Sequence, residues 1–126
     1  LRMSRGLGDV YKRQAYHIPL ILSGGALNVQ DTVVTTIGSQ TDMVATVLAQ
    51  LGMDHSGYKF SRNLLADQVI PFAFFSYPNG AGVVTEKGST YFSLQSQTFV
   101  EKDSVKEDGR LLKAYLQAIN EDFNRQ

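Results

Sequence analysis

The stretch PFAFFSYPNGAGVVTEKGSTYFSLQSQTFVEKD, residues 71–103, decides the fold that we predict for this chain. Short runs rich in aromatic and β-branched residues alternate in it with turn-forming residues. The runs predict strands at Phe72 to Tyr77, Val83 to Glu86, Thr90 to Ser93 and Thr98 to Lys102. The turns Pro78-Asn79-Gly80 and Lys87-Gly88 separate the first three. This spacing predicts an antiparallel meander.

The predicted strands are rich in aromatic residues, which allow two interpretations. The side chains could form a stacking platform for bases or sugars, but they lack the basic surround that such a platform needs, and this favours a role in the core. They are Phe72, Phe74, Phe75, Tyr77, Tyr91, Phe92 and Phe99.

A helix is predicted after the last strand. Ser104 and Glu107 match a capping box at its start. The apolar residues that follow fall at helical spacing and suit a helix that covers one face of the sheet. They are Leu112, Tyr115, Leu116, Ile119 and Phe123.

The part of the chain before the meander predicts extended segments. Ile18 to Leu22 is a short aliphatic run that ends at Ser23-Gly24-Gly25, and it favours a buried strand, with Pro19 near its start or on an edge. The glycine pair could form an anion-binding nest, although loop glycines more often just permit positive φ. Val33 to Ile37 predicts a second short strand or extended segment.

A helix is predicted after residue 39. Ser39 and Asp42 match a capping box, in which the hydroxyl accepts a backbone N–H and the carboxylate favours the positive end of the helix. Gly52 is the expected C-terminal stop. Capping explains Asp42 better than a catalytic carboxylate does. Five apolar residues fall on one helical face: Met43, Val44, Val47, Leu48 and Leu51.

Asp54-His55 is the pair with the most evident chemistry. Asp and His side by side can bind a divalent metal, but a site needs further ligands, and His17 is the only other histidine. The pair lies between a helix stop and Gly57, which favours a surface loop.

Residues 4–14, SRGLGDVYKRQ, differ from the rest of the chain. They lack the spacing and the hydroxyl of a phosphate loop, and back-translated they resemble a sequencing-library adapter along their whole length. We therefore expect residues 1–14 to be an artefact that interrupts a longer protein.

The whole chain has 12 basic and 12 acidic residues, but without these fourteen it has a net charge of −3. This charge gives no support for a nucleic-acid partner.

The composition also bears on cysteine chemistry and on membrane segments. The absence of cysteine excludes disulfides, thiolate metal sites and a cysteine nucleophile. No run reaches the apolar length of a membrane span, and no targeting segment is evident.

Four motifs, in order, carry a family resemblance: YHIPLILSGG, GSQTDMVATVLAQLGM, FSRNLL and FAFFSYPNGAGVVTEKG. The series resembles the C-terminal part of the sulfatase-like branch of the alkaline phosphatase superfamily, and within it the bacterial lipoteichoic-acid-synthase-like proteins. The resemblance covers nearly all of residues 15–126. It implies an α+β fragment: residues 15–66 end an α/β catalytic domain with its last strands and a helix, and residues 67–126 form a small antiparallel sheet with a closing helix.

The resemblance also implies a metal-dependent enzyme that acts on phosphate or sulfate esters, lipid head groups included. In the family a threonine, or a modified serine or cysteine, attacks the ester, and carboxylates and histidines hold a divalent metal such as Mn, Mg, Zn or Ca. The Asp-His-Gly metal motif normally lies just upstream of the strand that matches Ile18-Pro19-Leu20. The parent is expected to be anchored in a membrane by N-terminal helices, with an extracytoplasmic catalytic domain.

None of the family's functional residues falls on a position of this chain. We therefore predict no catalytic, cofactor-binding or metal-ligating residue here and expect the fragment to be inactive. His17 would at most lie near the site. The reaction stays open between phosphoglycerol transfer, phosphoethanolamine transfer and ester hydrolysis. The alternative from another class is a small independent α+β binding module without catalysis.

Overall fold

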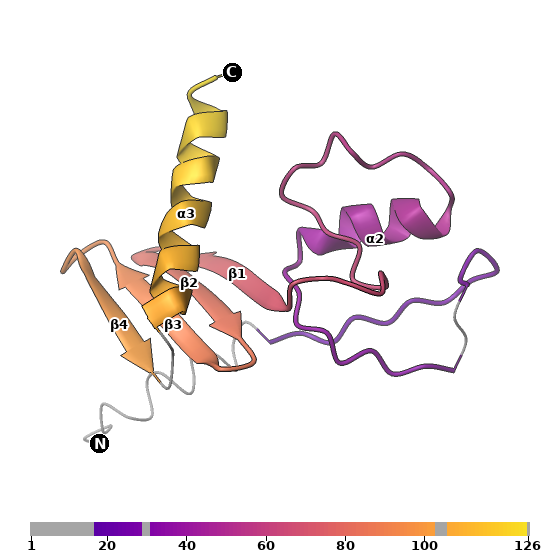
Figure 1. The fold of residues 1–126 in the computed structure, drawn as a ribbon, viewed down its shortest axis with the longest axis horizontal. Coiled ribbons are helices and arrows are strands. Elements are labelled where there is room, and N and C mark those ends of the chain that lie inside the picture. The colour runs from indigo at the N-terminus through magenta and orange to yellow at the C-terminus, as the bar shows by residue number, and fades with distance from the viewer. Residues whose placement is uncertain (1–16, 29–30, 103–105, 126) are drawn as a thin grey trace.

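The computed structural model describes residues 17–28, 31–102 and 106–125. Its sheet has four strands in the order β1-β2-β3-β4, with every neighbouring pair antiparallel (Figure 1). The predicted meander is therefore confirmed, and the described chain is a small α+β structure. The elements in chain order are α2 (Asp42–Gln50), β1 (Phe72–Tyr77), β2 (Gly80–Thr85), β3 (Gly88–Ser93), β4 (Thr98–Lys102) and α3 (Lys106–Phe123).

The bounds of β1 and β4 agree with the prediction, whereas β2 and β3 begin earlier than predicted. Tyr77 pairs with Gly80, and Thr85 pairs with Gly88. The first two turns therefore contain only two residues each, and the two glycines belong to strands rather than to turns.

Gly80 is required by a close backbone approach. A Cβ atom built there would lie 1.9 Å from the Phe92 carbonyl oxygen and 2.7 Å from the Tyr77 hydroxyl oxygen. The same Phe92 oxygen accepts a hydrogen bond of 2.9 Å from the Tyr77 hydroxyl. The first hairpin and β3 therefore meet at a point that has no room for a side chain.

Helix α3 crosses one face of the sheet and forms the core with it (Figure 1). Phe72, Ala81, Val83 and Leu112 are buried together. Leu112, Tyr115 and Leu116 of the predicted stripe contribute to this packing, but Ile119 and Phe123 remain exposed, because α3 runs on past the sheet. The predicted capping box of α3 cannot be compared, since Ser104 and the Glu107 side chain lie outside the described residues.

Tyr115 links α3 both to the sheet and to the loop that follows α2. Its ring centroid lies 4.5 Å from that of Phe74 in β1 and 5.6 Å from that of Phe60, in the loop that follows α2. Burial raises the pKa of the Tyr115 phenol above its usual value, and the nearby Asp42 carboxylate adds to the rise, while Thr41 and Arg62 act against it. Tyr115 therefore contacts both the sheet and the loop that follows α2.

The strand predicted at Ile18 to Leu22 is wrong, and of the two alternatives predicted at Val33 to Ile37 the strand is excluded. Residues 17–23 and 32–39 belong to no strand, and no described strand pairs with them. Ile18 is 58% exposed and Ile21 is 86% exposed. An aliphatic run becomes a strand only where neighbours satisfy its N–H and C=O groups, and the described residues supply no neighbour here.

Helix α2 is confirmed, and it ends where predicted. Gly52 has a φ of +67°, its N–H bonds to the Ala49 carbonyl, and the Met53 N–H bonds to the Leu48 carbonyl. This pair of bonds is a Schellman motif, which favours glycine at that position. Among the described residues, neither helix has the length and apolar character to cross a membrane.

We predict that Gly80→Ala destabilises the chain by about 3 kcal/mol or more, because its methyl group must displace the backbone carbonyl of Phe92. Gly57→Ala is the matched control, since a Cβ there meets no atom within 4 Å, and it should change stability by less than about 1 kcal/mol. Urea unfolding followed by circular dichroism measures both. Equal stability of the two variants would contradict the close approach.

Candidate functional site

Helix α2 buries its polar side. Asp42, Ala45 and Thr46 are at most 1% exposed. Most of the apolar face identified in the sequence is turned to solvent: Met43, Val44, Val47 and Leu51 are 36% to 54% exposed. These residues do share one face of the helix as predicted, but they do not belong to the core of the described chain. The buried side of α2 is therefore the candidate site.

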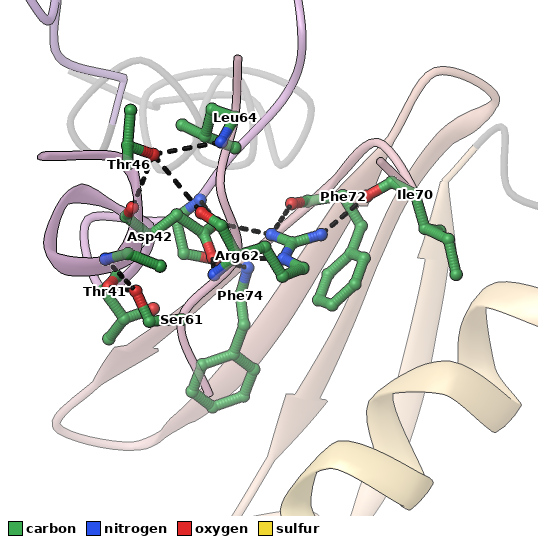
Figure 2. Close-up of polar contacts among 11 residues, drawn as sticks. Thr41, Asp42, Thr46, Ser61, Arg62, Leu64, Ile70, Phe72 and Phe74 are labelled. Carbon is green, nitrogen blue, oxygen red and sulfur yellow. Dashed lines mark hydrogen bonds and ion pairs between the residues drawn. The ribbon is translucent and has the colours of Figure 1, made fainter. Parts of the chain in front are cut away.

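Asp42 is the centre of a buried cluster of hydrogen bonds (Figure 2). Its Oδ1 accepts from the Arg62 backbone N–H at 2.8 Å and from Arg62 Nε at 3.0 Å. Its Oδ2 accepts from the Ser39 backbone N–H at 2.7 Å and from Arg62 Nη2 at 2.5 Å. Four donors match the four lone-pair positions of a carboxylate, so Asp42 is fully satisfied.

Arg62 joins this carboxylate to the start of the sheet. Its Nη1 donates to the Ile70 carbonyl at 2.6 Å, and its Nη2 donates to the Phe72 carbonyl at 2.7 Å. The guanidinium carbon lies 3.7 Å from the centroid of the Phe72 ring, a cation–π contact. One planar side chain thus binds the N-terminus of α2 and the entry into β1 (Figure 2).

Three hydroxyl groups surround the ion pair. Thr46 Oγ1 donates to the Asp42 carbonyl at 2.7 Å and accepts from the Leu64 N–H at 3.0 Å. Ser61 Oγ donates to the Thr41 carbonyl and accepts from the Ala45 N–H. Ser39 Oγ accepts from the Phe74 N–H at 2.7 Å. Each hydroxyl therefore joins segments that are far apart in the sequence.

The predicted capping box of α2 is half confirmed. The Asp42 carboxylate does accept from the Ser39 N–H, which is its part of the box. The hydroxyl part is wrong, because Ser39 Oγ bonds to the Phe74 N–H of β1, and the residue before the helix, Thr41, makes no side-chain cap bond either. The amide of β1 thus takes the acceptor that the helix was expected to use.

The cluster holds structure together and offers no reactive group. The Asp42 side chain is inaccessible, and both of its oxygens are occupied by donors from the chain. Four of the five N–H groups of Arg62 point to chain acceptors. A buried pair of this kind costs desolvation energy, which the additional hydrogen bonds offset. The capping interpretation of Asp42 is therefore favoured over a catalytic one.

The sequence predicted Asp42 but missed Arg62. Arg62 lies twenty residues beyond Asp42, in the FSRNLL motif, which the family resemblance included without giving it a role. Its position after a helix stop and a loop carries no local signal of an ion pair. Only the fold brings the two side chains together.

Asp54 and His55 form no metal site with the described residues. Asp54 is exposed, its Oδ1 accepts from the Ser56 N–H at 3.1 Å, and its Oδ2 accepts from the Ser56 hydroxyl at 2.9 Å. The Ser56 amide bond, followed by the hydroxyl bond, lowers the pKa of Asp54 below its usual value. Within the described ranges no group of three His, Cys, Asp or Glu residues could hold a metal ion. The exposure of Asp54 outside any helix or strand agrees with the predicted surface loop.

The remaining candidates also have structural explanations. His17 is exposed, and Gly24 has a φ of +144° in a turn that Leu27 closes, as expected for a loop glycine. The aromatic residues divide between the two faces of the sheet. Phe72, Phe74, Phe92 and Phe99 lie beneath α3. Phe75, Tyr77 and Tyr91 lie on the opposite face, where the Phe75 ring packs over Gly82. This division leaves no continuous platform of seven rings.

Comparison of the chain with protein-family models, with curated proteins and with solved structures finds no match.

We predict that Asp42→Ala destabilises the chain by about 3 to 5 kcal/mol, or leaves it unfolded, because it strands the Arg62 charge against two carbonyl groups. The other described ion pair is the matched control. Lys59 Nζ lies 2.9 Å from Asp122 Oδ1, but the two side chains are 67% and 33% exposed. Lys59→Ala should therefore cost less than about 1 kcal/mol. Urea unfolding measures the stability of both variants, and a comparable loss in the two would contradict the structural role of the Asp42–Arg62 ion pair.

Proposed function

We propose that this chain is the C-terminal part of a bacterial metal-dependent phospho- or sulfoester transferase or hydrolase of the sulfatase family. The support from sequence is the ordered series of motifs around Ile18-Pro19-Leu20, Gln40-Thr41-Asp42, Leu51-Gly52 and the meander. The order of a helix, a small antiparallel sheet and a closing helix is compatible with that assignment.

The observation that carries the proposal is the apolar face of α2. Val44 and Val47 are 41% and 39% exposed, and Ile18, Leu20 and Ile21 are also exposed. Met43, Val44 and Val47 lie together on α2 and are all exposed, and larger exposed apolar patches mark contacts with further protein. In the proposed parent these residues pack against the rest of the catalytic domain.

The proposal assigns the chemistry to the parent and a structural role to this chain. In this proposal the nucleophile and the metal ligands come from residues upstream, as the family resemblance implies. The part played by this chain is to hold α2 in place through Asp42 and Arg62, with its apolar face outward. The substrate class is a phosphate or sulfate ester, lipid head groups included, and the membrane anchor would also lie upstream.

The test is the coding sequence upstream of Tyr16 in an intact genome, followed by expression of the complete protein. We expect membrane-spanning segments, a threonine nucleophile and Asp-His-Gly ahead of Tyr16. We also expect ester cleavage or transfer that a metal chelator abolishes and a divalent metal restores. A start codon close to Tyr16, or a complete protein whose ester chemistry survives chelation, would refute the proposal. The former result would favour the independent binding module instead.

A further inference from the structure

Strand β1 lies at an edge of the sheet, so one row of its backbone groups pairs with no strand of the described residues. Tyr77 and Gly80 flank a two-residue turn and therefore exchange hydrogen bonds with each other. Because the direction of these bonds alternates along an antiparallel strand, Phe75 also bonds toward β2, whereas Phe72 and Phe74 direct their N–H and C=O groups outward.

Side chains from the α2 region occupy this outward row. The Phe74 N–H donates to Ser39 Oγ at 2.7 Å, and the Phe72 carbonyl accepts from Arg62 Nη2 at 2.7 Å. The Ile70 carbonyl, just before the strand, accepts from Arg62 Nη1 at 2.6 Å. Successive outward groups at 70, 72 and 74 are therefore bonded to side chains in the place where a further strand would bond (Figure 2).

We infer that Ser39 and Arg62 close the outer edge of β1 and prevent a second copy of the chain from adding a strand there. Unpaired edge strands are templates for strand addition and aggregation, and proteins cover them or place charge on them. An incoming strand would have to displace the guanidinium from both carbonyls. It would thereby disturb the ion pair with Asp42, whose side chain is completely buried. The inference does not depend on the proposed function.

The residue types suit this role. An arginine presents five N–H groups in a rigid plane, so Arg62 binds both oxygens of Asp42 and still reaches two carbonyls. A lysine has one nitrogen and cannot match that arrangement. Ser39 is fixed by its own N–H, which donates to Asp42 Oδ2, so its hydroxyl stays directed at β1. Asp42 thus positions both residues that close the edge.

The experiment compares Ser39→Ala with Ser61→Ala in the full chain. Both remove a hydroxyl of the same cluster, but only Ser39 bonds to β1, whereas Ser61 bonds to the backbone of residues 41 and 45. Amide hydrogen exchange, resolved by residue with NMR, reports on Phe74 and on Phe75. Sedimentation velocity over a concentration series reports self-association. Ser39→Thr keeps a hydroxyl and serves as the rescue variant.

Ser39→Ala should speed exchange of the Phe74 amide about five- to tenfold at low concentration, with Phe75 unchanged. As concentration rises it should self-associate more than the wild type and regain protection at Phe74. Ser61→Ala and Ser39→Thr should behave as the wild type in both measurements. Unchanged Phe74 exchange, equal acceleration of Phe74 and Phe75, or sedimentation identical to that of the wild type would each overturn the inference.

Discussion

The ion pair between Asp42 and Arg62 is the interaction on which the arrangement of the described chain depends. It connects the first turn of α2 to residues 70 and 72, and so sets where the sheet begins relative to the helix. Because the carboxylate is buried, it also decides which side of α2 faces inward. The apolar face must then point outward, although hydrophobic burial alone would favour the opposite orientation. The four donors around Asp42 and the contact of Arg62 with Phe72 offset the cost of burying charge.

The sheet and α3 complete a separate, conventional core. Val83 and Leu112 are almost fully buried where the helix crosses the strands. The sheet with α3 meets α2 and its following loop at two places. The Tyr115 ring packs against Phe60 and Phe74, and Ser39 bonds to β1. The contact between them is therefore made by one polar cluster and one aromatic cluster. Its polar part also occupies the outward backbone groups of Phe72 and Phe74 in β1.

The features that the sequence predicted correctly are those set by residues close together in the chain. The meander, α2 and its stop at Gly52 follow from strand propensity, helical spacing and the need for positive φ. The strand predicted at Ile18 to Leu22 is wrong, since pairing depends on distant neighbours that a local pattern does not contain. Arg62 was missed for the same reason. Asp42 was correctly assigned to the start of a helix, but its burial and its partner are properties of the fold.

Helix α2 turns its apolar face outward and its polar residues Asp42 and Thr46 inward, and the proposed function depends on this orientation. Since the chain has no cysteine, single thiols can report this orientation directly. Val47→Cys and Thr46→Cys place a thiol on adjacent residues of α2 that are 39% and 1% exposed. The measurement is the rate of thiol labelling under native conditions. We expect rapid labelling at Val47 and labelling at Thr46 slower by about a hundredfold or more, because the latter requires local opening. Protection at Val47 with rapid labelling at Thr46 would contradict the account.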